Sequence, residues 1–404
     1  MRPLLITVGS RGDVQPYLAL ARGLTAAGHQ PVVAAPRRFQ PLADRHGVDF
    51  VPLNDEMLEL QDSVKGQGVR AAMTAARSVK PMLRRLLDDQ AALAARPADM
   101  VVYHPKSLGG PHIAEKFGVP AVAALLLPLY LPTTAFPSPI FPVRVPRALN
   151  RASWRITAAV EAPYRGTVRA WRTGALGLES TFRPVADLIG EGGVLHAWSP
   201  HLLPAPADWP VAAQPTGFWT MPAGDGWMPP ERLARFLEEG EPPVYIGFGS
   251  SVTGDPETLT ATVLKAIRLA GRRAVLATGW GALRPGAETG GVLVLEDAPH
   301  DWLLPRVEVA VHHGGIGTVA AALQAGVPQV VRPFIGDQPF WAGRLHHLGV
   351  APAPLSGRLT PERLAAAVED AAKLAPAART LAVRLKEEDG VAAAVARLEG
   401  RRDS

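Results

Sequence analysis

The stretch from His312 to Trp341 reads HHGGIGTVAAALQAGVPQVVRPFIGDQPFW, and it predicts the architecture of this chain. It begins at the end of an apolar run, residues 307–311, that is typical of a buried parallel strand. A glycine-rich turn follows, and then a segment of helical composition that stops at Gly326, where glycine commonly ends a helix. A strand, a glycine turn and a helix in this order direct unpaired backbone N–H groups and a helix dipole at an anion. The stretch therefore predicts a phosphate site in an α/β fold.

A second loop of interest follows the next predicted strand, residues 329–334. It contains Gly336, Asp337, Gln338 and Pro339. An acid beside an amide at the carboxyl end of a strand suits a ligand rich in hydroxyl groups. Asp337 also has a simpler interpretation, as a turn residue between a glycine and a proline. A phosphate loop followed by a polyol loop indicates a nucleotide sugar, and we favour sugar binding for this pair.

Composition limits the class of protein. With 404 residues and 47% hydrophobic content, the chain can bury a large core, and two domains are expected. The absence of cysteine excludes disulfides and thiolate metal sites and fits a reducing cytosol. The N-terminal apolar run is too short for a signal peptide, and the longest apolar stretch, 117–132, is interrupted by prolines. A formal charge of +5 does not indicate nucleic acid. We therefore expect a cytoplasmic protein.

Strand and helix patterns alternate along the chain, which predicts doubly wound parallel sheets. We expect the first domain at 1–203, a linker rich in proline and glycine at 204–230, a second domain at 231–385, and a C-terminal helix at 386–404 that packs back on the first domain. The predicted strands are 4–8, 31–35, 48–53, 99–103, 120–127, 194–199, 244–248, 274–278, 292–295, 307–311 and 329–334. The longer predicted helices begin at Pro16 after a loop, or cover 68–95, 147–171 and 361–399. Ligands of open α/β sheets bind at strand carboxyl ends, so we expect the site in a cleft between the two halves.

Several motifs together resemble one family. Residues 313–318 (HGGIGT) with 336–339 (GDQP) resemble the donor-binding signature of inverting family 1 glycosyltransferases of the UDP-glycosyltransferase type. That family has the GT-B fold, in which two Rossmann-like domains face each other across a cleft. Residues 9–16 (GSRGDVQP), 247–251 (GFGSS) and 298–302 (APHDW) are most similar to the branch of sterol 3β-glucosyltransferases, to which bacterial antibiotic glycosyltransferases are close. The resemblance covers nearly the whole chain in order.

The resemblance implies a role for each matching residue. Asp13 falls where the family places its general base. Donor contacts are implied for His313, Gly315, Gly317 and Thr318 at the diphosphate, Asp337 and Gln338 at the sugar, Ala298 and His300 at the nucleobase, Ser250 beside the phosphates, and Ser10, Arg11 and Gly12 in the turn of Asp13; Trp280, at a strand end, is a further candidate. Two departures stand out. Plant members bind ribose with a glutamate where this chain has Ala321, and they use a His–Asp pair where it has Asp13 itself.

The implied reaction is a single displacement in which an acceptor hydroxyl attacks the anomeric carbon. A positioned base accelerates such a step by roughly 10²–10⁴-fold. Asp13, with an ordinary pKa of about 3.9, takes the proton only as the bond forms unless burial raises its pKa. The alternative is that Asp13 caps the helix that begins near Pro16.

We expect no metal and no cofactor. The chain contains no Asp-x-Asp motif. His312 and His313 are adjacent on a strand end, so their side chains point apart, which argues against a shared metal. His312 is expected to pack behind the turn, while His313 and the helix N-terminus stabilise the leaving diphosphate.

The resulting hypothesis is an O-glycosyltransferase that moves glucose from UDP-glucose to a lipophilic acceptor such as a sterol or a polyketide. The proline-rich segment 128–146 is the candidate acceptor lip, although it could also be a spacer. One alternative is a TDP-deoxysugar transferase of antibiotic biosynthesis. A second is an inactive homologue that serves as a scaffold, which predicts loss of the base or of the phosphate turn. A Rossmann dehydrogenase is a third, but the dinucleotide fingerprint is missing near the N-terminus.

A row of basic residues has two interpretations. One is a basic, aromatic-flanked face that contacts anionic lipid weakly; the other, which we favour, is a solvated helix face. The row comprises Arg144, Arg147, Arg151, Arg155, Arg165, Arg169 and Arg172, with Trp154 and Trp171 among them.

Overall fold

The structure, a computed structural model, describes residues 1–63, 69–141, 145–181, 183–224, 227–249, 255–279, 283 and 291–401. It separates into two compact units. The first unit contains the chain up to Met221 together with the tail that starts at Asp389, and the second contains Pro222–Glu388. The linker expected at 204–230 is therefore divided, and most of it belongs to the first unit.

The first unit is built on a sheet of six parallel strands in the order β3-β2-β1-β4-β5-β6. Each strand predicted for this half is present, with shorter bounds except for the second, which is shifted by one residue from 31–35 to 32–36. Leu4 on the central strand is paired with Val32 on one side and Val101 on the other. The strands are β1 (Pro3–Ile6), β2 (Val32–Pro36), β3 (Phe50–Leu53), β4 (Met100–Tyr103), β5 (Ala121–Leu125) and β6 (Val194–His196). The two central strands, β1 and β4, are buried along their whole length, as their continuous apolar sequences predict.

The helices of the first unit differ from the prediction at one important point. Helix α1 (Arg11–Ala26) starts five residues before Pro16, so the segment expected to be a loop is its first turn. Pro16 is tolerated inside the helix because the N–H that it lacks would have bonded to the carbonyl of Gly12, a residue that is exposed to water. The other helices are α2 (Gln40–Arg45), α3 (Glu56–Ser63), α4 (Val69–Ala92), α5 (Gly110–Phe117), α6 (Asn150–Ser153), α7 (Ile156–Glu161), α8 (Arg165–Trp171), α9 (Val185–Gly192) and α17 (Gly390–Gly400).

Two long helices predicted from composition are interrupted. The one at 147–171 is divided into α6, α7 and α8, and a one-turn 3-10 segment containing Pro163 separates the last two. The one at 361–399 is three helices, α15 (Pro361–Ala372), α16 (Ala375–Leu385) and α17. Pro376 lies in the first turn of α16, where a proline starts a helix rather than continuing one. Asp389 starts α17 by accepting a hydrogen bond from the N–H of Ala392 at 2.8 Å.

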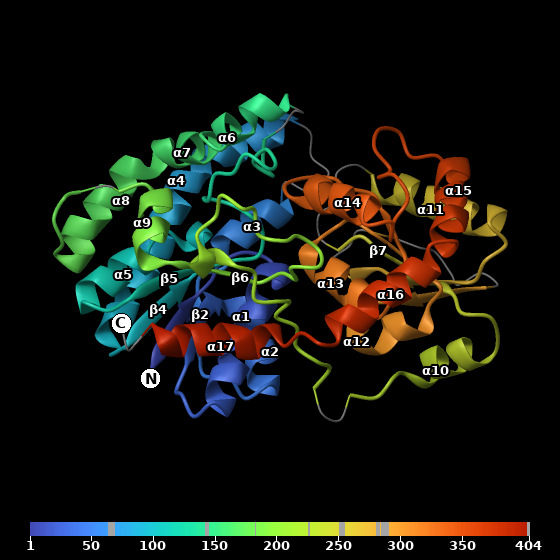
Figure 1. Ribbon diagram of the computed structural model, residues 1–404, viewed down its shortest axis with the longest axis horizontal. Coiled ribbons are helices and arrows are strands. Elements are labelled where there is room, and N and C mark those ends of the chain that lie inside the picture. Colours follow the sequence, from blue (N-terminus) through green and yellow to red (C-terminus); the bar gives the residue numbers. More distant parts are fainter. Residues whose placement is uncertain are drawn as a thin grey trace. The chain divides into compact units, whose positions relative to one another are not determined.

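The last helix, α17, belongs to the first unit and packs along α1 (Figure 1). The contact is close at Gly23, where a Cβ atom would fall 2.2 Å from Val391. Arg401 donates a hydrogen bond to the carbonyl oxygen of Gly192 at 2.8 Å, and His29 contacts Glu399 at 2.9 Å.

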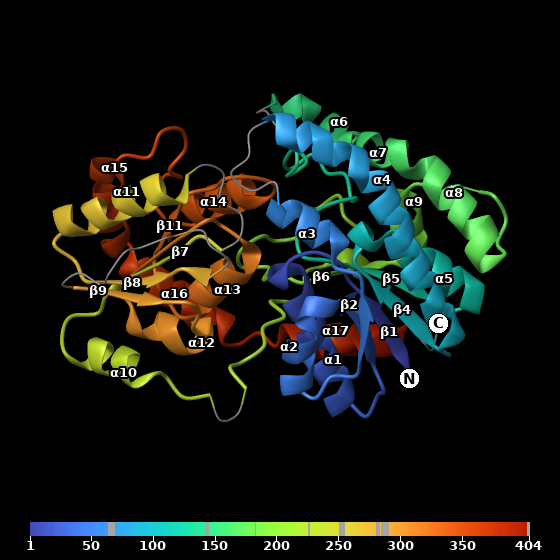
Figure 2. The same cartoon turned by 180° about the vertical axis from the view of Figure 1, so that it is seen from behind.

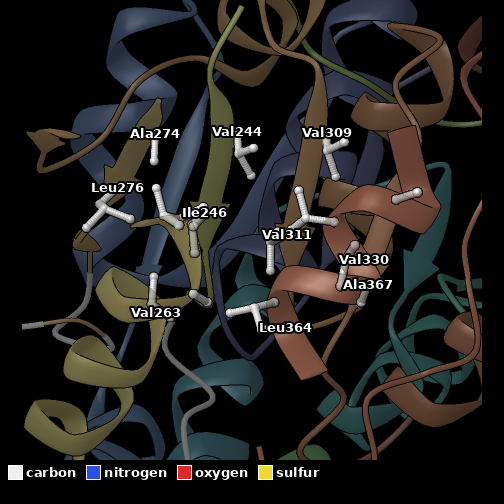
Figure 3. Packing of buried hydrophobic residues seen from close by; sticks show 14 of the residues in the cluster. Val244, Ile246, Val263, Ala274, Leu276, Val309, Val311, Val330, Leu364 and Ala367 are labelled. Carbon is white, nitrogen blue, oxygen red and sulfur yellow. The ribbon is translucent and has the colours of Figure 1, made fainter. Parts of the chain in front are cut away.

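The second unit contains five parallel strands in the order β11-β10-β7-β8-β9. Successive side chains on each strand enter opposite cores. Val244 and Ile246 face the core under α11 and α15 (Figure 3). Tyr245 faces the core that contains residues of α10, α12 and α13, and Figure 2 shows these three helices on the side of the sheet away from α11 and α15. The elements are α10 (Glu231–Glu238), β7 (Val244–Gly247), α11 (Pro256–Leu269), β8 (Ala274–Ala277), β9 (Val292–Leu295), α12 (His300–Leu303), β10 (Val309–His312), α13 (Ile316–Gln324), β11 (Gln329–Val331) and α14 (Gln338–His347).

Each sheet has one point at which the strand order reverses. In the first sheet this point lies between β1 and β4, and in the second it lies between β7 and β10. At these points Ile6 pairs with Tyr103, and Gly247 pairs with His312. Ligands of open α/β sheets bind outside the carboxyl ends of the strands at such a point. The loops that follow these four strands are therefore the positions at which to look for function.

Candidate active site

The glycine turn after β10 is braced from behind by His312. The N–H of Gly314 donates to Nδ1 of His312 at 3.0 Å, so the proton of the neutral ring is on Nε2, which donates to the side-chain oxygen of Gln329 at 2.8 Å. Burial lowers the pKa of His312 to about 3, helped by the neighbouring His313, so the ring stays neutral. His312 is fully buried and packs behind the turn, as the sequence predicts.

His313 lies in the turn itself and is only partly buried. Its pKa falls to about 4, chiefly because of burial and to a lesser extent because of His300, while the carbonyl of Gly247 opposes the shift. Its Nδ1 is buried and has no hydrogen-bond partner in the described part of the chain. A Cβ atom at Gly315 would fall 2.4 Å from Nε2 of His313, so only glycine leaves room for the ring. A neutral imidazole has one N–H donor and one acceptor nitrogen.

Helix α13 starts immediately after this turn, with Gly315 as its N-terminal cap. The N–H groups of the first turn, which includes Gly317 and Thr318, have no acceptor within the helix. Gly317 is exposed, and Thr318 is 9% exposed. The helix dipole adds an attraction for anions of about 0.3–1 kcal/mol at an exposed site and up to about 2 kcal/mol at a partly buried one. The turn and the helix together form an arrangement that can bind a diphosphate.

The loop after β11 is held by Gln338. Its side-chain oxygen accepts from the N–H of Phe334 at 2.7 Å and from that of Ile335 at 3.1 Å, and the residue is 5% exposed. Asp337 accepts from the indole N–H of Trp341 at 2.9 Å. The side chains of both residues therefore make hydrogen bonds that stabilise the protein itself. If Gln338 contacts a sugar, the contact must come from its amide NH2 group, because its oxygen already accepts two bonds.

The nucleobase candidates also lie in the second unit. The hydroxyl of Tyr245 is 2.9 Å from Nε2 of His300, at the start of α12. Ala298 is 7% exposed, and its side chain belongs to the core on the Tyr245 face of the sheet, which leaves its backbone for ligand contacts. Ser250 and Trp280 lie outside the described residues.

Asp13 lies in the first turn of α1, at the point of strand-order reversal in the first sheet. Its Oδ2 accepts from the backbone N–H of Ser10 at 2.9 Å and from the Ser10 hydroxyl at 3.2 Å. The N-terminal cap of α1 is Ser10, and Asp13 is the third residue of the helix, so the alternative that Asp13 caps a helix beginning near Pro16 is wrong. Its Oδ1 accepts from Nζ of Lys106 at 2.6 Å. Gly9 has φ +124°, and a Cβ atom there would fall 2.3 Å from Oδ2. Glycine is therefore required for the carboxylate to lie where it does.

The pKa of Asp13 is lowered. Burial pushes it upward, but the Lys106 ammonium, His104 and the N–H of Ser10 together outweigh burial. The sequence left open whether burial would raise the pKa of this carboxyl group, and the structure shows that it does not. Asp13 is ionised at neutral pH and can accept a proton.

His104 is a site residue that sequence reasoning missed. It is 2% exposed, and burial lowers its pKa to about 3, with Lys106 acting in the same direction and Asp13 against it. Its Nδ1 accepts from the N–H of Lys106 at 3.1 Å, so the proton is on Nε2. Nε2 is 3.8 Å from Oδ1 of Asp13, is buried, and has no hydrogen-bond partner among the described residues. The available signal was the position of His104 and Lys106 directly after the predicted strand 99–103.

The remaining residues of this turn have local partners. Nε of Arg11 donates to the side-chain oxygen of Gln15 at 3.0 Å, one turn along α1. Gly12 is exposed. Both hydrogen bonds that Ser10 is described as donating are made to Asp13. Donor contacts by these three residues remain predictions.

The proline-rich segment, of which residues 128–141 and 145–146 are described, carries a second group that the sequence did not reveal. Tyr130 has φ +68°, which is unusual for a bulky residue, and its side chain hydrogen-bonds to Glu161. Glu161 also accepts from the N–H of Val185 at 3.2 Å, and burial raises its pKa. Its Oε1 and the hydroxyl of Tyr103 are buried without hydrogen-bond partners among the described residues. Such groups are candidates for contact with a polar ligand or an ordered water.

The interpretation of the basic row as an aromatic-flanked face is wrong in part. Trp154 and Trp171 are buried, at 2% and 0% exposure, and Arg172 is buried in an ion pair with Glu115 at 2.7 Å. The aromatic residues therefore belong to the core. The exposed arginines of the row are Arg147, Arg151, Arg155, Arg165 and Arg169, and Arg144 lies outside the described residues.

Two further findings concern the described ranges alone. Within them, no group of three or more His, Cys, Asp and Glu side chains is placed to hold a metal ion. None of the helices described above has the length and apolar character needed to cross a membrane.

Known proteins resemble both halves of the chain. Residues 4–136 match the glycosyltransferase family 28 N-terminal domain, and residues 287–395 match the erythromycin biosynthesis protein CIII-like C-terminal domain. The sterol 3-beta-glucosyltransferase of Neosartorya fischeri is 34% identical over 98% of this chain and 29% of its own length. Sterol 3-beta-glucosyltransferase UGT80A2 of Arabidopsis thaliana is 34% identical over 98% of this chain and 64% of its own length. The chain thus spans less than two thirds of these relatives.

Solved structures agree with the fold. The calicheamicin glycosyltransferase CalG4 superimposes with a TM-score of 0.71 over 99% of this chain and 98% of its own, at 22% identity. The two units of this chain, each built on a parallel sheet, are those expected of the GT-B fold. The chain has the GT-B fold, contains a glycosyltransferase family 28 N-terminal domain and an erythromycin biosynthesis protein CIII-like C-terminal domain, and is similar over nearly its whole length to the sterol 3β-glucosyltransferases.

Proposed function

We propose that this protein transfers glucose from UDP-glucose to a hydroxyl group of a lipophilic acceptor, with inversion at the anomeric carbon. The observation that carries the proposal is the turn after β10. Neutral His313 and the free N–H groups of α13 lie together there, at the reversal point of the second sheet. Glucose as the sugar and a sterol-like acceptor are supported by the sterol 3-beta-glucosyltransferases that match 98% of the chain.

In the proposed step the acceptor oxygen attacks the anomeric carbon as its proton passes to the Asp13 carboxylate. The bond between that carbon and the diphosphate oxygen breaks, and the electron pair leaves with the nucleoside diphosphate. Asp13 suits the task because its lowered pKa keeps it ionised. The charge that develops on the diphosphate would be stabilised by the N-terminus of α13 and by His313. We propose that the step uses no metal, because the chain has no Asp-x-Asp motif to hold one.

A donor-binding experiment tests the first half of the proposal. Thermal unfolding is followed with UDP, dTDP, GDP and their glucose conjugates, since a ligand that binds only the folded protein stabilises it. We expect the largest stabilisation with UDP-glucose, and we expect His313→Ala to abolish it. His347→Ala is the matched control, because His347 is exposed on α14. Lack of stabilisation by any nucleotide would refute the proposal.

Transfer and stereochemistry test the second half. The enzyme is incubated with UDP-glucose and sterol or polyketide alcohols, and the anomeric configuration of the product is read from its proton NMR coupling. We expect a β-glucoside, and an α-glucoside would exclude inversion. A dTDP-deoxysugar is the alternative donor, favoured by the match of residues 287–395 to an erythromycin biosynthesis domain. Stabilisation by dTDP compounds alone would establish that alternative.

A further inference from the structure

We propose that Lys106 is a positioning residue for the base: it holds Oδ1 of Asp13 in the empty enzyme and releases that oxygen to the acceptor hydroxyl. This inference rests on the proposed function, in which Asp13 accepts the proton of the acceptor.

The two oxygens of Asp13 are held in different ways. Oδ2 accepts from the backbone N–H and the hydroxyl of Ser10, which are part of the cap of α1 and cannot move without unwinding the helix. Oδ1 accepts from Nζ of Lys106 at 2.6 Å. The Lys106 side chain is 53% exposed, whereas that of Asp13 is 15% exposed. A lysine ammonium on a flexible, hydrated stem is easily displaced. Oδ1 is therefore the oxygen that an acceptor can reach.

His104 provides a second, fixed donor for the same oxygen. Its Nε2–H is 3.8 Å from Oδ1 and has no hydrogen-bond partner in the described structure. The N–H of Lys106 holds the other ring nitrogen, so the orientation of the imidazole does not depend on the Lys106 side chain. When the ammonium moves away, a small shift brings Oδ1 into hydrogen-bond range of His104. The carboxylate then remains oriented while the acceptor hydroxyl takes the place of the ammonium.

The energetic cost of releasing Lys106 is small. Ion pairs between exposed groups contribute about 0.2–1 kcal/mol, which corresponds to a factor of about 1.4 to 5 in an equilibrium constant, and the Lys106 end of this pair is exposed. The ammonium also lowers the pKa of Asp13, which keeps the empty enzyme in the ionised form that the reaction needs. Removing the charge should therefore have two effects, easier entry of the acceptor and a carboxyl group that is protonated at higher pH.

The experiment compares the wild type with Lys106→Met, which keeps the stem and removes the charge. Lys106→Arg keeps the charge, and Lys116→Met serves as the control because Lys116 is an exposed residue of α5. Three quantities are measured: the Asp13 titration by carboxyl 13C NMR, the pH profile of kcat/KM for the acceptor, and the two KM values. For Lys106→Met we expect the titration and the acid limb to move to higher pH. Acceptor KM should fall by up to about fivefold, while donor KM is unchanged.

Lys106→Arg and Lys116→Met should both stay close to the wild type. An active Lys106→Met enzyme with the wild-type acid limb and acceptor KM would show that Lys106 is only a surface ion-pair partner and would overturn the inference. A failure of the proposed function gives a different result, because the wild-type enzyme itself would then transfer no sugar. That result would remove the proposed function and this inference together.

Discussion

His312 donates a hydrogen bond from Nε2 to the side-chain oxygen of Gln329 over 2.8 Å, and both residues are fully buried. The bond connects β10 to β11 behind the glycine turn, where His312 pairs in register with Val331. Since the other ring nitrogen accepts from Gly314, one imidazole connects the neighbouring strand to the glycine turn. The backbone that would face a diphosphate is thus positioned by a neutral side chain that does not itself face the ligand.

Replacing Gln329 with leucine should weaken both the fold and donor binding. The change leaves the N–H of His312 buried with no acceptor, which costs about 1–3 kcal/mol, and it removes the brace of the turn. Urea unfolding and calorimetric titration with UDP measure the two effects. Gln324→Leu, at a partly exposed position at the end of α13, should change neither. Wild-type affinity and stability in Gln329→Leu would show that the brace is unimportant.

Asp13→Asn should slow transfer strongly while donor binding is retained. An amide cannot accept the acceptor proton, so we expect the rate to fall by roughly 10²–10⁴-fold. The control is Asp389→Asn, which changes another helix-capping carboxylate of the same unit, at the start of α17. Product formation is followed by chromatography, and UDP binding by calorimetry. Activity within tenfold of the wild type would exclude Asp13 as the base.

Gly9→Ala should impair transfer through a steric effect on Asp13. Gly9 has φ +124°, and a Cβ atom there would fall 2.3 Å from the Asp13 carboxylate. Gly28→Ala is the matched control, because Gly28 also has a positive φ, +81°, but has nothing within 4 Å. Both variants should lose roughly 1–3 kcal/mol of stability from backbone strain. Although the two variants lose similar stability, only Gly9→Ala should also lose transferase activity. Equal activity in the two variants would contradict the steric argument.

Acidification should destabilise the protein below about pH 6.5. Burial lowers the pKa values of several histidines, which are His104, His196 and His312 at about 3 and His112 and His313 at about 4. Between those values and about 6.5 the unfolded chain binds protons that the folded protein does not, so stability falls as the pH falls. Each such histidine contributes a slope of up to about 1.4 kcal/mol per pH unit. Burial raises the pKa of Glu161, which acts in the opposite direction but is a single group.

Urea unfolding at pH 7.5, 6.5, 5.5 and 4.5 checks this prediction. His312→Gln should reduce the slope for the second unit, whereas His347→Ala should leave it unchanged because His347 is exposed. Stability that is constant from pH 7.5 to pH 4.5 would contradict the burial of neutral imidazoles.

The strands were predicted well and the helix ends less well, for a physical reason. A central parallel strand is buried on both faces, so its sequence is a continuous apolar run such as Leu4–Ile6 that has no other stable location. A helix end depends on which backbone groups find partners. The start of α1 at Arg11 depends on Ser10 and on the Asp13 carboxylate. The prediction put that start at Pro16 instead, because proline is common at the first position of a helix. The long helix expected at 361–399 is interrupted twice, also for local reasons: Pro376 begins α16, and Asp389 caps α17.

By itself the sequence determined the two parallel sheets, the glycine turn at 314–317 and the family, because apolar runs, glycines and motif order are properties of the chain alone. Only the tertiary structure placed Lys106 and His104 beside Asp13. These residues are more than ninety positions apart in the chain, at 13 and 104–106, and they meet because β1 and β4 are neighbours in the sheet. The structure also showed that the pKa of Asp13 is lowered rather than raised. The charge state of a carboxyl group depends on which donors surround it in space, and spacing along a chain does not contain that information.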